Sequence, residues 1–179
     1  MKHLFAAAML VAAVAGAADI PDAEVVDQAG RTLHFQRDLI AGKVVVVAFF
    51  FTSCETVCPT VGNTLVRLQN ALGDRLGRDV SIVSVSIDPR RDTPAALAAW
   101  AQRFGVKSGW TLVTGDAAAL ARVAEAMTGG VPKPADHEAA LYVVDGRTGR
   151  WVRDSALARP KHYLALLDRM REGDPPEKE

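Results

Sequence analysis

The sequence predicts a single α/β domain built on a central mixed sheet flanked by helices. Two features of the pattern predict this class. Short apolar runs rich in β-branched residues alternate along the chain with segments whose apolar residues recur every three or four positions, and Gly, Pro or Asp separate them. The length of 179 residues and a hydrophobic content of 49% suit one globular domain without a repeat or a linker.

The first half of the chain predicts a hairpin, a strand and a helix. Residues 23–35 hold two apolar runs split by a glycine-containing turn, which is typical of a β-hairpin. Residues 43–52 are continuously apolar, β-branched and aromatic, as in a central strand that is covered on both faces. From Thr60 the apolar residues follow one helical face as far as Gly73.

The second half continues the alternation and ends in an antiparallel edge. Thr93 is a good N-cap because Pro94 follows it at the first helical position, and Asp116 suits the same role for the next helix. The predicted strands are 79–88, 110–113, 139–144 and 150–153, and the predicted helices are 94–104, 116–127 and 160–171.

The two ends of the chain have a different character. Residues 1–17 combine a basic start, a short apolar core and small residues before a cleavage point at Ala17, which predicts a secretory signal peptide. The protein would then work outside the cytosol, in the periplasm of a bacterium, and the alternative is an uncleaved inner-membrane anchor facing the same compartment. Residues 172–179 are charged and contain proline, so we expect a disordered tail.

Charge and cysteine content exclude several classes of protein. The 21 basic side chains equal the 21 acidic ones, which gives no electrostatic basis for binding nucleic acid. The chain also lacks the run of about 18 apolar residues that a spanning helix requires. Two cysteines are too few for a disulfide scaffold, so Cys54 and Cys58 need another explanation.

The cysteine pair lies where the strand 43–52 ends and the next helix begins. Catalytic groups and ligands in α/β sheets gather at the carboxyl ends of strands, and a helix N-terminus stabilises the thiolate form of cysteine. The spacing between Cys54 and Cys58 suits a disulfide or shared coordination of one metal ion. A structural disulfide that only braces the loop, redox chemistry and metal binding all remain open at this point.

The position of His137 favours metal binding over thiol redox chemistry. His137 stands in a polar loop before the apolar strand 139–144, which we expect beside strand 43–52 in a parallel sheet, with the imidazole close to the thiols. Two soft thiolates and one imidazole suit Cu(I), and with an added ligand they suit Cu(II). A structural zinc site would require a fourth protein ligand, and none is evident in the sequence.

Several segments together resemble the Sco/SenC family of copper chaperones. They are residues 51–60 (FTSCETVCPT), 85–94 (VSIDPRRDTP), 110–115 (WTLVTG) and the pair Asp136-His137. The resemblance implies a thioredoxin-like domain over residues 18–171, with Cys54, Cys58 and His137 as copper ligands and a role in metallating the Cu(A) centre of cytochrome c oxidase. Family members usually carry Cys-Pro-Asp-x-Cys, whereas Glu55-Thr56 replaces Pro-Asp here. We interpret residues 88–94 as structural, with electrostatic tuning by Asp88 as the alternative.

Two functions compete at the same pair of thiols. The first is a periplasmic chaperone that carries copper, as Cu(I) or Cu(II), to an apo-cuproprotein such as cytochrome c oxidase subunit II, with an upstream copper donor or a thiol reductant as a further partner. The second is a thiol:disulfide oxidoreductase that reduces the cysteines of that apo-cuproprotein, with Cys54 attacking and Cys58 resolving. A thiol peroxidase fits less well because the second cysteine is too close.

Overall fold

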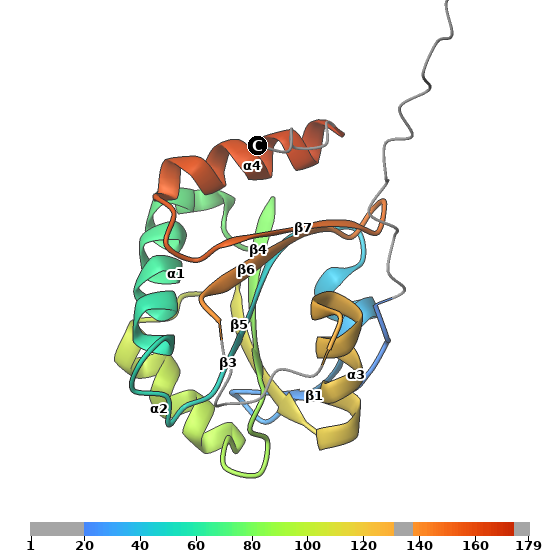
Figure 1. Ribbon diagram of the computed structural model, residues 1–179, viewed down its shortest axis with the longest axis vertical. Helices are drawn as coiled ribbons and strands as arrows, with labels where there is room; N and C mark the ends of the chain where they lie inside the picture. Colours follow the sequence, from blue (N-terminus) through green and yellow to red (C-terminus); the bar gives the residue numbers. More distant parts are fainter. Residues whose placement is uncertain (1–19, 131–137, 174–179) are drawn as a thin grey trace, which may run out of the picture.

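The computed structural model describes residues 20–130 and 138–173, which form a seven-stranded mixed sheet with helices on both faces (Figure 1). The strand order is β2-β1-β5-β4-β3-β6-β7. The strands are β1 (Glu24–Asp27), β2 (Thr32–His34), β3 (Val44–Phe50), β4 (Val80–Ser86), β5 (Trp110–Gly115), β6 (Ala140–Asp145) and β7 (Arg150–Ser155). The helices are η1 (Phe35–Ile40), α1 (Cys58–Leu72), η2 (Gly73–Arg75), α2 (Pro94–Phe104), α3 (Ala117–Thr128) and α4 (Pro160–Glu172).

Strand β3 is the centre of the sheet, as its apolar sequence predicts. All seven of its residues are buried. Val44, Val46, Ala48 and Phe50 pack into one hydrophobic core, and the residues between them pack into a second core on the opposite face of the sheet. This division follows from the two-residue period of a strand. The carboxyl end of β3 is therefore held from both sides.

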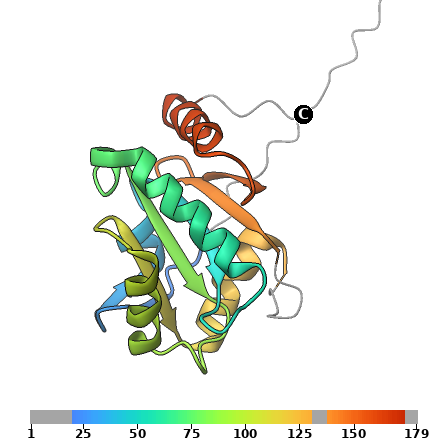
Figure 2. The ribbon, with the colours of Figure 1, turned by 90° about the vertical axis from the view of Figure 1, so that its left-hand side faces the viewer.

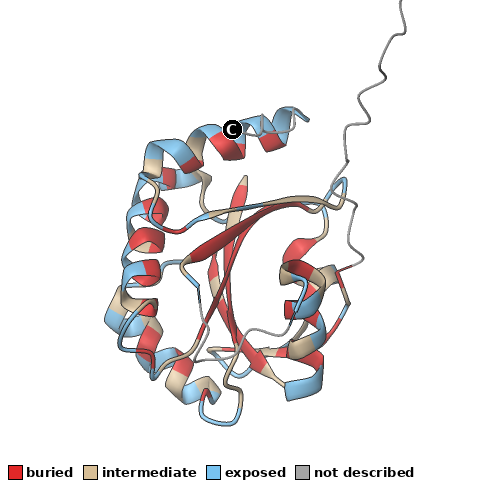
Figure 3. Cartoon of the chain, viewed as in Figure 1, coloured by how far each residue is buried: buried red, intermediate tan, exposed pale blue. Residues whose placement is uncertain are grey.

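The two cores place different helices on the two faces of the sheet. Helices α1, α2 and α4 cover one face, and α3 with the π-helix η1 covers the other (Figures 1 and 2). In α1 and α3 the buried residues lie on the side of the helix that faces the sheet, and exposed residues lie on the outer side (Figure 3). The predicted order of strands and helices is confirmed, although the sequence pattern does not predict η1.

Helix boundaries follow the caps that the sequence predicts. The Thr93 hydroxyl accepts a hydrogen bond from Ala96 N at 3.2 Å, and Asp116 accepts one from Ala119 N at 2.9 Å. Helix α1 differs, because it begins at Cys58 rather than at Thr60. Proline at the second position of a helix removes only an N–H that has no partner within the helix, so Pro59 belongs to the first turn. Cys58 is thus the first residue of α1.

Strand β6 pairs with β3 as predicted, but its direction is antiparallel rather than parallel. Val44 lies opposite Asp145, and Val47 lies opposite Tyr142. Strands β3, β4 and β5 are parallel to one another. Because β6 runs against β3, the start of β6 lies at the carboxyl end of β3.

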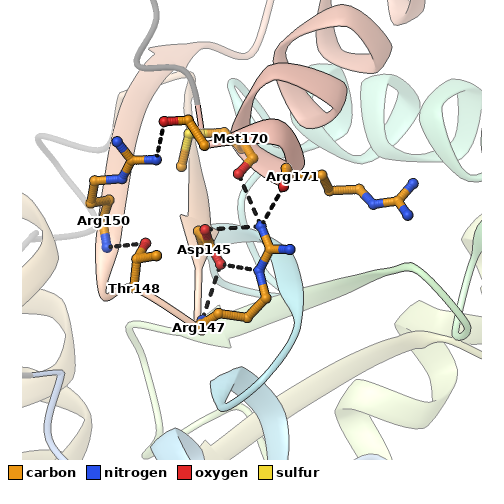
Figure 4. Close-up of polar contacts among 7 residues, drawn as sticks. Asp145, Arg147, Thr148, Arg150, Met170 and Arg171 are labelled. Atoms are coloured by element: carbon orange, nitrogen blue, oxygen red, sulfur yellow. Dashed lines mark hydrogen bonds and ion pairs between the residues drawn. The ribbon is translucent and has the colours of Figure 1, made fainter.

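Helix α4 is fixed to the turn between β6 and β7 by hydrogen bonds from Arg147, whose guanidinium also pairs with the buried Asp145 (Figure 4). Arg147 Nε lies 2.8 Å from a carboxylate oxygen of Asp145, which has no exposed surface. The same guanidinium donates to the carbonyls of Met170 and Arg171 at 3.1 Å and 3.0 Å, while Arg150 donates to the carbonyl of Gly173. These bonds satisfy carbonyls that the end of a helix leaves without partners.

The ends predicted from the sequence lie mostly outside the described residues. Residues 1–17, the predicted signal peptide, and 174–179, most of the predicted tail, are not described. Helix α4 runs to Glu172, one residue beyond its predicted end. None of the helices within residues 20–130 and 138–173 combines the length and the apolar character that crossing a membrane requires.

Candidate metal centre

The two cysteines stand on the loop that joins β3 to α1, at the carboxyl end of the central strand. The Cys54 N–H donates to the carbonyl of Phe51 at 3.2 Å, which turns the chain directly after β3. Cys58 opens α1 four residues later. The predicted position of the pair, between a buried strand and a helix N-terminus, is confirmed.

The sulfur of Cys54 receives hydrogen bonds from the first turn of α1. Cys58 N donates to Cys54 Sγ at 3.3 Å, and the Thr56 hydroxyl lies 3.9 Å from the same sulfur. Cys54 keeps 7% of its surface exposed, whereas Cys58 keeps 1%. The loop therefore presents one sulfur to solvent and holds the second one behind it.

The surroundings shift the pKa values of the two thiols in opposite directions. Burial by itself raises the pKa of Cys54, but hydrogen bonds from Cys58 and Thr56 outweigh burial, so the pKa lies below its ordinary value. For Cys58, burial raises the pKa to about 12, and the hydrogen bond to Cys54 and the negative charge of Asp92 act in the same direction. The outer thiol is thus the one that ionises more readily.

A buried carboxylate supports the cysteine loop through hydrogen bonds to the residue that follows β3 by two positions. Asp92 has no exposed surface and accepts hydrogen bonds from the N–H and the hydroxyl of Thr52, at 3.1 Å and 2.5 Å. It also accepts one from the Ser86 hydroxyl at 2.6 Å. Asp92 therefore ties the first residues after β3 to the end of β4 and to the start of α2.

Asp92 was not singled out by the sequence analysis, which considered Asp88 within the same motif. Asp88 pairs with the exposed Arg91 at 3.5 Å, and its backbone N–H donates to the Ser86 hydroxyl. The sequence signal for Asp92 is the hydroxyl residue that follows or ends each of two apolar strands, namely Thr52 and Ser86. A buried hydroxyl needs a hydrogen-bond partner, and Asp92 is the nearby residue that can accept from both.

His137 lies outside the described residues, so the structure does not test the predicted ligand. Of the other histidines that the structure describes, His34 pairs with Asp22 and His162 pairs with Asp154, each away from the cysteine loop. Within residues 20–130 and 138–173, no group of three or more His, Cys, Asp or Glu side chains is arranged to hold a metal ion.

The start of β6, directly after the predicted ligand, is held in place by side chains of β6 and β7. Glu138 forms an ion pair with Arg153, which also contacts the hydroxyl of Tyr142. Ala156 N donates to the carbonyl of Ala139 at 2.8 Å, which extends the pairing of β6 with β7 to the first residues that follow the undescribed segment. Because β6 is antiparallel to β3, its first residue, Ala140, lies toward the carboxyl end of β3, from which the cysteine loop leaves.

A dithiol at the carboxyl end of the central strand, with one outer and one inner sulfur, defines a thioredoxin-like protein capable of thiol redox chemistry or soft-metal binding. A family model described as SCO1/SenC matches residues 16–161. The chain belongs to this family.

Individual relatives agree with this assignment. A SCO2-like protein from Rickettsia conorii is 36% identical over 86 residues, which are 48% of this chain and 40% of the relative. A SCO1/SenC family lipoprotein from Bacillus anthracis is 27% identical, with a TM-score of 0.71 over 83% of this chain and 92% of that one. Bradyrhizobium japonicum ScoI with copper bound is also 27% identical, with a TM-score of 0.67 over 82% of this chain and 96% of that one.

BsSco, whose structure identified a disulfide switch, is named as a member of the Sco family of cytochrome c oxidase assembly proteins. Its TM-score is 0.70 at 22% identity, over 83% of this chain and 91% of that one, a likeness that shows the fold. The match with the Rickettsia relative spans less than half of that protein's length.

Proposed function

We propose that this chain is a periplasmic copper-delivery protein that holds copper through Cys54, Cys58 and His137 and helps to assemble the Cu(A) centre of cytochrome c oxidase. The observation that carries the proposal is the pair of cysteines at the carboxyl end of β3, in which the backbone N–H of Cys58 donates to the sulfur of Cys54 at 3.3 Å and Cys58 is the more deeply buried of the two. The copper-bound ScoI structure, at 27% identity, supports copper as the metal.

The antiparallel direction of β6 supports His137 as the third ligand. The strand starts at the carboxyl end of β3, and His137 directly precedes Glu138, the first described residue after the gap. One residue spans at most about 3.6 Å. The residue that follows position 137 in the sequence thus belongs to the end of the sheet that carries the cysteine loop.

The chemistry of this donor set suits transfer of copper. Thiolate sulfur is a soft ligand that favours Cu(I), and imidazole also accepts Cu(II). Three protein ligands leave room for an incoming thiolate of the recipient, and Cys54, the less deeply buried of the two cysteines, is the ligand from which exchange would start. Copper is the cargo in this scheme, so binding must be reversible.

Substitution of the histidine tests the ligand set. We expect His137→Ala to weaken copper binding by at least about tenfold, because it removes one of three donors, and to leave the reduction potential of the dithiol nearly unchanged. The measurement is an anaerobic titration of the reduced protein with Cu(I) and Cu(II), followed by thiolate-to-Cu(II) charge-transfer absorption. His162→Ala is the matched control, since that imidazole pairs with Asp154. Equal copper affinity of His137→Ala and the unaltered protein contradicts the ligand assignment.

A second candidate function is reduction of a disulfide in an apo-cuproprotein. The difference in exposure and in pKa between the two cysteines favours it, because Cys54 is the thiol that is ready to attack. Its thiolate would form a mixed disulfide and release one partner thiolate. Cys58 would then attack Cys54, releasing the second partner thiol and leaving the Cys54–Cys58 disulfide. Rapid reduction of a peptide disulfide by a protein that binds no copper would favour this function over delivery.

The proposed location rests on the sequence of residues 1–17 and on a relative. That segment has the pattern of a signal peptide, and the Bacillus anthracis family member is described as a lipoprotein. Expression of the full chain followed by mass determination of the exported product tests this point. A product that retains residue 1 and stays in the membrane fraction would identify an anchor instead of a cleaved signal.

A further inference from the structure

A groove opens beside Cys54 and runs along α1. It has a volume of about 610 Å³ and is lined by Cys54, Glu55, Pro59, Asn63, Val66, Arg103 and Phe104. Cys58 does not line it. The three residues of α1 in this set recur at intervals of four and three, so they share one helix face. A partner that reaches Cys54 along this groove meets α1 and the last turn of α2.

The far wall of the groove is held rigidly by close packing between α1 and α2, which lie on the same face of the sheet (Figure 2). Gly62 brings the helices together, since a Cβ atom there would lie 2.6 Å from the Phe104 ring. That ring stacks on Trp100 with centroids 4.0 Å apart. The Arg103 guanidinium lies 5.0 Å from the centre of the Phe104 ring. The wall therefore presents a positioned cation over an aromatic surface.

The groove carries opposite charges on the sides of its two helices. Glu55 is exposed beside Cys54, and Arg103 is exposed on α2. Neither side chain forms an ion pair with any residue that the structure describes. An acidic group on a partner is disfavoured directly at the thiol and favoured near Arg103.

The length of the groove sets the spacing of the partner's groups. Along α1 the segment from Pro59 to Val66 rises about 10 Å, at 1.5 Å per residue. An extended peptide covers that length in about three residues, at 3.3 Å each. A segment of about three residues therefore spans the α1 wall of the groove, so an acidic residue that meets Arg103 lies within about three positions of a cysteine that meets Cys54.

We propose that this groove docks a cysteine-containing segment of a partner protein, with the partner's cysteine at Cys54 and an acidic side chain, within about three residues of it, at Arg103. This inference rests on the proposed function, because it supplies the recognition that thiol-based copper transfer or disulfide exchange requires. Arg103 has no ion-pair partner among the described residues, so its charge selects an acidic occupant, and the volume of the groove limits direct contact to a short segment.

Synthetic peptides with one cysteine test the proposal without copper. The cysteine carries thionitrobenzoate in a disulfide, and the protein is the reduced Cys58→Ser variant. The Cys54 thiolate attacks the peptide sulfur, a Cys54–peptide disulfide forms, the original disulfide breaks, and coloured thionitrobenzoate leaves as a thiolate. Four peptides differ only in charge placement, with Glu, Gln or Lys three residues from the cysteine, or Glu adjacent to it.

We expect the peptide with Glu at the third position to react about three to ten times faster than the Gln peptide, and the Lys peptide to be the slowest of the three. Arg103→Glu should reverse the order of the Glu and Lys peptides. The matched control is Arg122→Glu, an exposed arginine of α3 on the opposite face of the sheet, which should keep the original order. Raising the salt concentration should reduce the preference.

Two results would overturn the docking proposal. One is an equal effect of Arg103→Glu and Arg122→Glu on all peptides. The other is that the peptide with Glu beside the cysteine, or the thionitrobenzoate disulfide of free cysteine, reacts as fast as the peptide with Glu at the third position. Either outcome identifies an occupant smaller than a peptide segment. Copper titration of the unaltered protein is read separately. Absence of copper binding would refute the delivery function while leaving the peptide order to decide the docking site.

Discussion

Removing the carboxylate of Asp92 should destabilise the protein and disturb the cysteine loop together. In the folded protein Asp92 is fully buried and accepts hydrogen bonds from the Thr52 N–H, the Thr52 hydroxyl and the Ser86 hydroxyl. Asp92→Ala leaves these donors without their acceptor. Hydrogen bonds to a charged group contribute about 1.5–3 kcal/mol each, and the hydroxyls recover part of this by turning to other acceptors. We therefore expect a loss of about 3–5 kcal/mol in the free energy of unfolding.

Urea unfolding of the reduced protein, followed by tryptophan fluorescence, measures this loss. Asp92→Asn keeps the shape of the side chain and one oxygen acceptor, so its loss should be smaller, about 1–2 kcal/mol. Asp88→Ala is the control, because Asp88 pairs with an exposed arginine, and such pairs contribute about 0–1 kcal/mol. A loss below about 1 kcal/mol for Asp92→Ala, or a loss equal to that of Asp88→Ala, would refute the supporting role of Asp92.

The same substitution has a second readout at the thiols. The negative charge of Asp92 contributes to the raised pKa of Cys58, after burial and the hydrogen bond to Cys54. Asp92→Asn removes that charge and should lower the pKa of Cys58, which is measured by the pH dependence of thiolate absorption at 240 nm in a variant lacking Cys54. An unchanged pKa would show that Asp92 acts on stability alone.

Three further predictions follow from the described contacts. Alkylation of the reduced protein should modify Cys54 more than about tenfold faster than Cys58, because Cys54 is the more exposed thiol and has the lower pKa; equal rates by peptide mass spectrometry would contradict this. Burial opposes ionisation of Asp145, but hydrogen bonds and charge from Arg147 outweigh it and hold the pKa below 3.8. A lowered carboxyl pKa stabilises the fold above about pH 4, and this stabilisation is lost as the pH falls through the folded-state pKa. Arg147→Gln should therefore move the midpoint of acid unfolding, followed by circular dichroism, to higher pH. An unchanged midpoint would count against the ion pair. Gly62→Ala should lower the free energy of unfolding by about 1 kcal/mol despite better helix propensity, since its Cβ atom meets a packed ring at 2.6 Å; a more stable variant would show that the ring moves easily.

The sequence predicts the fold and the position of the thiols because local pattern and global structure agree there. The β-branched and aromatic run 43–52 favours a doubly covered strand, and Thr93 and Asp116 cap helices by short-range hydrogen bonds. The predicted parallel direction of β6 is wrong, because an apolar run fits either direction of pairing. The role of Asp92 is also missed, since its partners lie up to 40 residues away along the chain.

The groove residues illustrate the same limit. Arg103 and Phe104 end a helix whose pattern is predicted correctly, yet nothing local connects them with Cys54. The connection arises from the packing of α1 against α2, which Gly62 permits. The assignment of His137 as a ligand still rests on the sequence and the resemblance.

The antiparallel pairing of β3 with β6 also determines how the chain must fold as it is made. Val47 pairs with Tyr142, and about half of the chain's length separates the two residues. Until β6 is available, β3 is an apolar strand with an open hydrogen-bonding edge, the kind of edge that recruits other chains. A chain truncated before residue 138 would retain both cysteines and yet be prone to aggregate. The C-terminal segment thus protects the site during biogenesis, in addition to any part it takes in binding copper.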